Sequence, residues 1–224
     1  MICFPTIEIK DPDSWDICDK AIWRLSEYSS VCFTSKNAVT KFIERIRSIR
    51  PHAADTLATR NIFAVGEKTR RSLETCGFSV LASPKHASAD ELVSLLQAHQ
   101  IKGAKILFPK SNIAREEFPR HLRSAGAAVD EIAVYQTVVP EPENLEIIHH
   151  MFLDDKIDIA TFFSPSSLIN FVELIGVEIL AHTAIAVIGP TTAETAQQLG
   201  LSVAILSQKA TAEGMVEAIE SYLQ

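Results

Sequence analysis

Clusters of serine and threonine follow apolar segments of the chain and lead directly into helical patterns. In the segment 158–176, a strand pattern of β-branched and aromatic residues stops at Ser164, and Pro165 and Ser166 open the next helix. Serine is a favoured N-cap, and proline suits the first helical position. The amino end of such a helix offers free backbone N–H groups and partial positive charge, which suit a carboxylate. The alternative is that these hydroxyls only cap helices.

The same kind of junction occurs four times. Ser35 lies 129 residues before Ser164, and Gly66 lies 123 residues before Gly189, each in a matching sequence context. Repetition at matching places indicates a shared role, and anion binding and plain helix capping both stay open at this point. The candidate anion-binding residues at the four junctions are Ser35, Asn37, Gly66, Thr69, Ser164, Ser166, Gly189, Thr191 and Thr192.

Three segments match in the same order between the two halves of the chain, which indicates two related domains. FAVGEKTRRSLETCGFSV matches AVIGPTTAETAQQLGLSV, and SADELVSLL matches TAEGMVEAI at the same offset. We therefore expect a first domain over residues 11–133 and a second over 139–224, with any N-terminal contribution from 1–10. Residues 1–10 and 134–138 are expected to run side by side as paired interdomain linkers.

Strand and helix patterns alternate in both halves, which predicts parallel sheets. Each domain is expected to be a flavodoxin-like, doubly wound α/β domain. One unit has no counterpart: residues 102–138 contain a strand over 105–108, a turn at 109–111 and a helix near 118–125. The second domain is therefore expected to lack its first βα unit and to be completed from the N-terminal side of the chain.

The composition is that of an ordinary globular chain, with 47% hydrophobic and 22% charged residues among 224. A net charge of −7 argues against a nucleic-acid surface but not against a small anion. No segment approaches the roughly 18 apolar residues of a membrane span, and the N-terminus lacks a signal-peptide pattern. The four cysteines are scattered, which indicates reduced thiols in a cytoplasmic protein. His149 and His150 have no third ligand at a useful spacing, so no metal is expected.

Six motifs follow one another along the whole chain: CFTSKNAV, AVGEKTRRSL, ILFPKSNIAREEFPRHLRSAGA, VYQTV, FFSPSSLINF and AIAVIGPTTAETAQQLG. In this order they resemble the uroporphyrinogen-III synthase family of tetrapyrrole biosynthesis. VYQTV, FFSPS and IGPTTA are specific only in combination. The family's fold of two α/β domains joined by two crossing strands agrees with the repeat. This chain departs from the family at its start, where members usually have a strand, a turn containing Arg-Pro and a helix.

The resemblance implies a lyase without a cofactor, which cyclises and dehydrates hydroxymethylbilane. The linear tetrapyrrole loses its hydroxyl as water, and a spiro intermediate lets the terminal ring invert before closure to uroporphyrinogen III. Because the uncatalysed closure gives the wrong isomer, orientation of the bound chain is the main contribution. The junction residues are expected to bind the substrate's acetate and propionate groups.

Two further residues are candidates for this chemistry. Tyr135 lies in the expected linker, and its phenol could donate a proton to the leaving hydroxyl. The alternative is a structural tyrosine bonded to backbone. Lys110 could add a cation for substrate carboxylates, and the alternative is a surface lysine of little effect.

The expected partner is the small-molecule tetrapyrrole substrate, with transfer from hydroxymethylbilane synthase as one possible route of delivery. Neither nucleic acid nor a membrane is expected as a partner, and the chain is expected to be a monomer in the cytoplasm. Two alternatives stay open, namely a two-domain protein that binds an anionic ligand without catalysis and an inactive synthase-like protein. The fold alone does not separate them, but turnover does.

Overall fold

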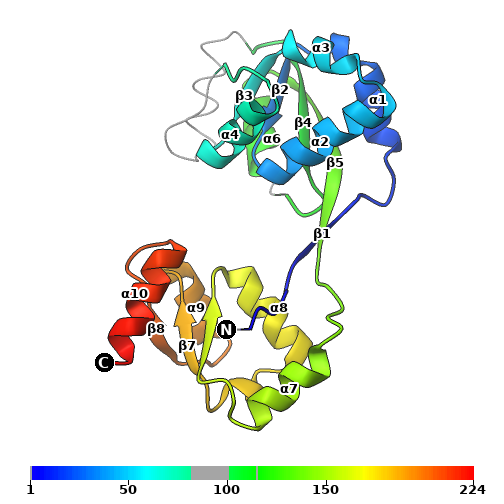
Figure 1. Cartoon of the computed structure of the whole chain (residues 1–224). Helices are drawn as coiled ribbons and strands as arrows, with labels where there is room; N and C mark the ends of the chain where they lie inside the picture. Colours follow the sequence, from blue (N-terminus) through cyan, green and yellow to red (C-terminus); the bar gives the residue numbers. More distant parts are fainter. Residues whose placement is uncertain (1, 82–100, 115) are drawn as a thin grey trace. The chain divides into compact units, whose positions relative to one another are not determined.

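The computed structural model describes residues 2–81, 101–114 and 116–224 (Figure 1). These residues form two compact units. The first unit is Ile9–Thr137, and the second combines Val138–Gln224 with the N-terminal segment through Glu8. Each unit contains a parallel sheet covered by helices, which confirms the expected α/β class. No helix among the described residues is long and apolar enough to cross a membrane.

The first unit has a five-stranded sheet in the order β1-β5-β4-β2-β3. The pairs β2–β3, β2–β4 and β4–β5 are parallel, and the order of these four strands is that of a flavodoxin-like sheet. The strands are β1 (Glu8–Lys10), β2 (Ser30–Phe33), β3 (Asn61–Ala64), β4 (Lys105–Ser111) and β5 (Ala128–Val138). The helices are α1 (Asp16–Trp23), η1 (Leu25–Glu27), α2 (Lys36–Ile49), α3 (Ala53–Ala58), α4 (Glu67–Thr75) and α6 (Glu117–Ser124).

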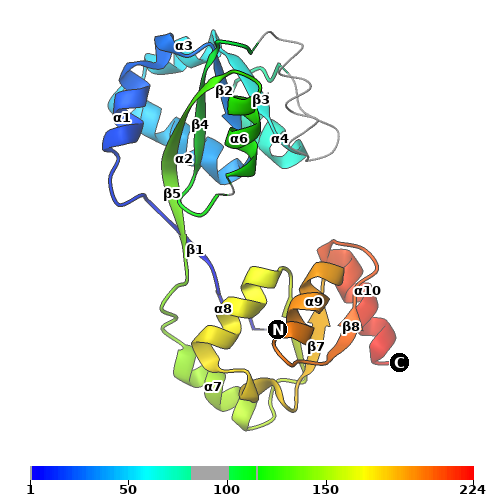
Figure 2. The ribbon, with the colours of Figure 1, turned by 180° about the vertical axis from the view of Figure 1, so that it is seen from behind.

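Helices cover both faces of this sheet, and each face buries an apolar cluster. On one face α1 and α2 pack over the strands, and the rings of Phe33 and Phe42 are fully buried. Figure 2 shows α6 on the opposite face, where the ring centroids of Phe108 and Phe118 lie 5.1 Å apart. Burying each such ring contributes about 1.5–3 kcal/mol, so both helix layers hold the sheet.

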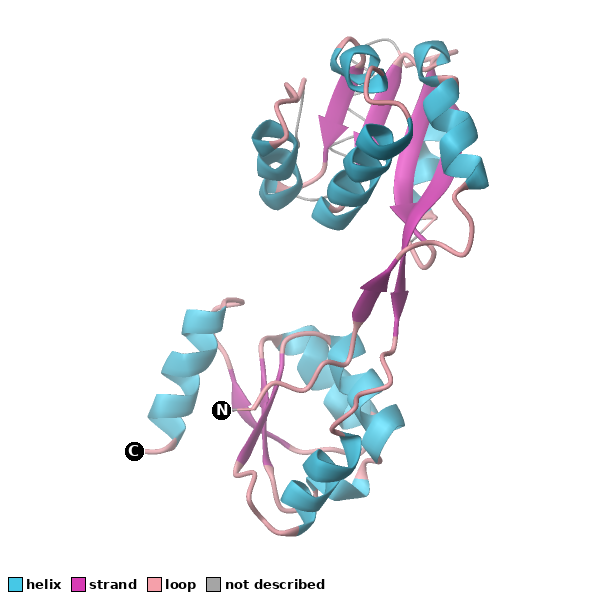
Figure 3. Ribbon diagram, turned by 45° about the vertical axis from the view of Figure 1, so that its right-hand side comes forward, coloured by secondary structure: helices cyan, strands magenta, loops and turns pink. Residues whose placement is uncertain are grey.

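The second unit has a three-stranded parallel sheet in the order β6-β7-β8 (Figure 3). Phe162 and Phe171 lie in its main apolar cluster, and Phe4 packs edge-on against Phe171 at 5.6 Å. This contact explains why the N-terminal segment belongs to the second unit. The strands are β6 (Ile159–Phe162), β7 (Ala184–Val187) and β8 (Val203–Leu206). The helices are α7 (Leu145–Leu153), α8 (Pro165–Ile175), η2 (Glu178–Leu180), α9 (Pro190–Gln198) and α10 (Ala212–Tyr222).

The internal repeat has a structural counterpart in the two units. Gly77 and Gly200 occupy matching places after α4 and α9, and both have a positive φ, 92° and 76°, which favours glycine after a helix. TAEGMVEAI begins α10 with its threonine as the N-cap, whereas the matching SADELVSLL lies outside the described residues. The described part of the second sheet holds no strand that corresponds to β4.

Strand β4 continues through residues 109–111, where the sequence predicted a turn, and that prediction was wrong. Proline cannot donate a hydrogen bond to a neighbouring strand and is therefore found at free strand edges. The pairing of β4 with β2 extends only as far as Leu107. At Pro109 the strand pairs with β5 alone, so the missing N–H costs no strand-to-strand hydrogen bond.

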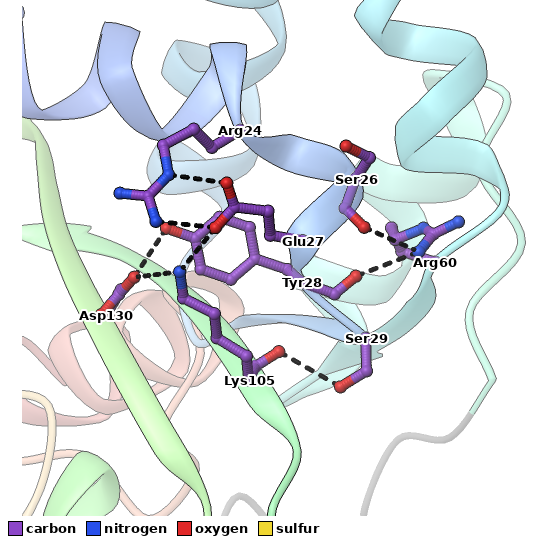
Figure 4. Close-up of polar contacts among 8 residues, drawn as sticks. All are labelled: Arg24, Ser26, Glu27, Tyr28, Ser29, Arg60, Lys105 and Asp130. Carbon is purple, nitrogen blue, oxygen red and sulfur yellow. Dashed lines mark hydrogen bonds and ion pairs between the residues drawn. The ribbon is translucent and has the colours of Figure 1, made fainter.

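Polar side chains tie together the amino ends of the strands in the first unit (Figure 4). The Tyr28 hydroxyl donates to Asp130 Oδ2 at 2.7 Å, and Lys105 forms ion pairs with Asp130 and Glu27. Arg24 donates two hydrogen bonds to Glu27. Burial, together with the hydrogen bond to Asp130, raises the pKa of the Tyr28 phenol. These residues lie at the sheet edge opposite the strands' carboxyl ends, which indicates a structural role.

A second ionic cluster lies on the α6 face of the sheet. Glu131 of β5 forms ion pairs with Lys110 of β4 and Arg123 of α6. The side chains of Lys110 and Glu131 are only 15% and 16% exposed. Burial alone would raise the pKa of Glu131, but hydrogen bonds from both cations outweigh burial and lower the pKa. A carboxyl group with a lowered pKa stabilises the fold above its unfolded pKa.

We predict that Glu131→Gln lowers the free energy of unfolding at neutral pH by about 1.5–3 kcal/mol, the range for hydrogen bonds to charged groups. The difference from the native chain should shrink below about pH 4, because the native carboxylate is then protonated as the pH falls through its folded pKa. Urea unfolding across this pH range measures both effects. Glu74→Gln is the control, because it breaks an exposed ion pair with Arg70 and should cost less than about 1 kcal/mol. Equal losses for both variants would contradict the prediction.

Candidate functional site at the carboxyl ends of the strands

A register shift in β5 determines where Tyr135 points. Lys110 of β4 pairs with Ala133, but the next residue, Ser111, pairs with Tyr135. Val134 is therefore one extra residue on β5, which is a β-bulge. Consecutive side chains of a regular strand point to opposite faces, yet Val134 and Tyr135 both lie in the apolar cluster under α2. The bulge thus turns Tyr135 toward the face that carries the first junction.

Tyr135 meets Ser35 at this face. The Tyr135 hydroxyl and Ser35 Oγ lie 3.1 Å apart, and either atom can be the donor. Ser35 is also the N-cap of α2, and its Oγ accepts from the Asn37 N–H at 3.1 Å. The Tyr135 ring is only 7% exposed and packs in the core, while Ser35 is half-buried. Two residues predicted separately from the sequence are therefore brought together, with Tyr135 in β5 and its hydroxyl bonded to a side chain.

Asn112, which the sequence reasoning missed, follows β4 at the same edge. Its backbone N–H donates to the Tyr135 carbonyl at 3.2 Å, and its Oδ1 accepts from the Thr137 N–H at 3.0 Å. Between them, Gln136 donates to the Asp11 carbonyl and the Asp13 carboxylate. An Asn after a strand is a turn signal in the sequence, but its long-range contact with β5 leaves no local pattern.

The second junction of the first unit begins α4. Gly66 is its N-cap with a φ of 82°, a value that favours glycine. Thr69 is 4% exposed, and its backbone N–H donates to the Gly66 carbonyl. The backbone of this helix start is therefore better placed for a ligand than the Thr69 hydroxyl.

The second unit repeats this arrangement at β6 and β7. Ser164 caps α8 by accepting from the Ser167 N–H, and its Oγ lies 3.1 Å from that of the exposed Ser166. Gly189 is the N-cap of α9. Thr191 is exposed at the start of this helix, whereas Thr192 is 2% exposed. Ser166 and Thr191 are therefore the accessible hydroxyls of these two junctions.

Lys110 does not join this set. It lies two residues after Phe108, on the α6 face, and pairs there with Glu131. Tyr135 lies on the opposite face, under α2. The lysine is thus held in an ion pair with a carboxylate on the face away from the phenol.

The arrangement suits binding of carboxylates and transfer of one proton. Helix starts provide backbone donors, and the Tyr135–Ser35 pair provides a phenol hydroxyl, a group that can act as a general acid. Among the residues that the structure describes, no three His, Cys, Asp or Glu side chains form a group that could hold a metal ion. All four cysteines are free, and burial raises the pKa of the Cys18 thiol to about 12.

Comparison with known proteins identifies the family. The family model described as uroporphyrinogen-III synthase HemD matches residues 1–217. The uroporphyrinogen-III synthase of Chlorobaculum parvum is 30% identical over 224 residues, which is 100% of this chain and 89% of that protein. The uroporphyrinogen-III synthase of Synechococcus elongatus is 30% identical over 99% of this chain and 86% of that protein.

Solved structures share the fold. The uroporphyrinogen-III synthetase of Helicobacter pylori matches with a TM-score of 0.69 at 18% identity, over 98% of this chain and 91% of that one. A mutant uroporphyrinogen III synthase of Thermus thermophilus matches with a TM-score of 0.65 at 16% identity, over 99% of this chain and 88% of that one. With the family model and the relatives in agreement along its length, the chain belongs to the uroporphyrinogen-III synthase family.

Proposed function

We propose that the chain performs the reaction of its family, the closure of hydroxymethylbilane to uroporphyrinogen III, with Tyr135 as the proton donor. The observation that supports this role most directly is the 3.1 Å contact between the Tyr135 hydroxyl and Ser35 Oγ at the carboxyl edge of the first sheet. Parallel α/β sheets bind their ligands at this edge.

The proposed chemistry needs one proton at the departing oxygen. The phenol of Tyr135 gives its proton as the C–O bond breaks, water leaves, and electrons from the adjacent pyrrole form an azafulvenium cation beside the phenolate. The substituted carbon of the terminal ring attacks the exocyclic methylene of this cation and forms the spiro intermediate. The bond from that carbon to its original methylene bridge then breaks, and this bridge forms a new bond to the free α-carbon of the inverted ring. The proton that this ring loses on closure restores the phenol, so that the sum is uroporphyrinogen and one water. Ser35 bonds to the phenol and holds it in place while the proton moves.

Binding of the substrate's carboxylates is assigned to the four helix starts. Each presents backbone N–H groups at the positive end of a helix dipole, supported by the exposed hydroxyls of Ser166 and Thr191. Gly66 and Gly189 contribute through their backbone positions as N-caps, whereas the Asn37 N–H is already bound by Ser35 Oγ. Lys110 is left out because it is held in an ion pair with Glu131 on the α6 face. The free cysteines suit the reducing conditions of the cytoplasm, which is the location we propose.

We predict that Tyr135→Phe lowers the rate of hydroxymethylbilane consumption by about 10²–10⁴-fold, the usual contribution of one general acid. Product affinity should change little, because one neutral hydrogen bond contributes only about 0.5–1.5 kcal/mol. Stopped-flow consumption assays and product titration measure the two effects. Tyr28→Phe is the matched control: it removes a buried hydroxyl from the opposite sheet edge and should cost stability without slowing turnover. An unchanged rate in Tyr135→Phe would assign Tyr135 a structural role, and binding without turnover by the native chain would favour a non-catalytic binding protein.

A second prediction concerns the hydroxyls of the second unit. Thr191→Ala or Ser166→Ala alone should weaken product binding by no more than about tenfold, because the backbone donors remain and keep the loss at or below the low end of the roughly 1.5–3 kcal/mol that a hydrogen bond to a charged group contributes. The double variant should bind more weakly than either. Titration calorimetry gives the affinities, and thermal melts give the stabilities.

Thr195→Ala is the control for this pair, because Thr195 lies one turn further along α9 and donates to the Thr191 carbonyl. It should leave product affinity unchanged. If the loss of binding free energy in the Thr191 and Ser166 variants only matches their loss of folding stability, the two hydroxyls do not bind the ligand and serve only the helix starts.

A further inference from the structure

We propose that Asn112 is a positioning residue for Tyr135: by binding the backbone on both sides of Gln136, it keeps the bulged end of β5 in the geometry that places the phenol at Ser35. The proposal rests on the role given to Tyr135 above. Asn112 makes no hydrogen bond to the phenol and acts through the strand that carries it.

The contacts of Asn112 lie where β5 departs from regular pairing. Up to Ala133 the strand follows β4 in register, and beyond the extra Val134 only Ser111 continues the pairing. A bulge locally disrupts the ladder of backbone hydrogen bonds. Two hydrogen bonds of Asn112 take the place of this ladder. Its N–H donates to the Tyr135 carbonyl at 3.2 Å, and its Oδ1 accepts from the Thr137 N–H at 3.0 Å.

The side chain of Asn112 is used as an acceptor only in this clamp. In a regular parallel pair, the Thr137 N–H would donate to a backbone carbonyl of β4. Here it donates to the side-chain Oδ1 of Asn112 instead. Asn112 is exposed, so it contributes little to the core, and its loss need not unfold the unit. Without the side-chain bond, the end of β5 is held by the backbone bond at Tyr135 and by the side chain of Gln136.

This role predicts different effects for two substitutions of Asn112. Asn112→Asp keeps an acceptor oxygen in the same place, so the Thr137 N–H stays bound. Asn112→Ala removes the acceptor and frees Thr137. We therefore expect Asn112→Ala to lower kcat by about 10–100-fold with little change in KM, in the range that small misplacements of catalytic groups produce. Asn112→Asp should restore kcat to near the native value.

Two readouts distinguish positioning from general stability. In a double-mutant cycle, Asn112→Ala should slow the native chain but not the Tyr135→Phe variant, because no phenol is left to misplace. Independently of activity, the ¹³Cζ NMR signal of Tyr135 should shift in Asn112→Ala and keep its position in Asn112→Asp. The chain has three tyrosines, and Tyr135→Phe assigns the signal.

Each contrary result overturns the proposal in a different way. If Asn112→Asp raises KM as much as it lowers turnover, the asparagine contacts the substrate carboxylates directly. If Asn112→Ala slows both backgrounds equally, its effect is general. If neither rate nor NMR signal changes, Asn112 does not position Tyr135. A failure of Tyr135→Phe to slow turnover counts against the acid role alone, because the NMR arm still reports whether Asn112 holds the phenol.

Discussion

One extra residue in strand β5 decides which face of the first sheet carries the phenol. In a regular strand Tyr135 would point to the same face as Ala133, two residues before it. Because Val134 is bulged, Tyr135 pairs with Ser111 and points to the opposite face. With this bulge, two neighbouring side chains enter the same apolar cluster, and the hydroxyl of Tyr135 emerges beside the cap of α2. Tyr135 is anchored by packing while its hydroxyl meets a half-buried serine, so a rigid core presents one hydroxyl at the strand ends.

The same construction at four strand ends gives an acidic chain local donors that suit the acidic ligand we propose. The net charge is −7, yet each junction offers backbone N–H groups and a helix dipole, which act over the first turn only. Lys110, the one cation selected from the sequence, pairs with Glu131 on the other face of the sheet instead. Binding by backbone donors is tolerant of side-chain changes, so substitution of a single hydroxyl has a small effect in this account.

Much of the fold could be predicted from the sequence because its signals are local and periodic. A serine followed by a proline after an apolar strand pattern predicts a helix start. Ser164 and Pro165 form such a pair, and α8 begins at Pro165. The glycines at 77 and 200 lie in segments that the sequence repeat had matched, and in the structure each follows a helix with a positive φ. Such patterns depend on a few neighbouring residues, which the sequence contains in full.

The remaining features depend on contacts between distant residues. The bulge at Val134 has no glycine or proline to mark it, and the strand through Pro109 follows from where β2 stops pairing. Thr69 and Thr192 are buried, whereas Thr191, next to Thr192, is exposed. This difference depends on which side of each helix faces its sheet. Asn112 and Glu131 were missed because their partners lie about 20 or more residues away or in another element.

The isomer composition of the product tests the central claim most directly, namely that the strand ends orient the substrate while Tyr135 supplies a proton. Hydroxymethylbilane is incubated with the purified chain and with Tyr135→Phe, and the products are oxidised and separated by chromatography. The account predicts that the native chain gives the type III isomer. It also predicts that the product formed above the uncatalysed background by Tyr135→Phe is still type III, because orientation does not depend on the phenol. Type I product at the uncatalysed rate from the native chain would contradict the account.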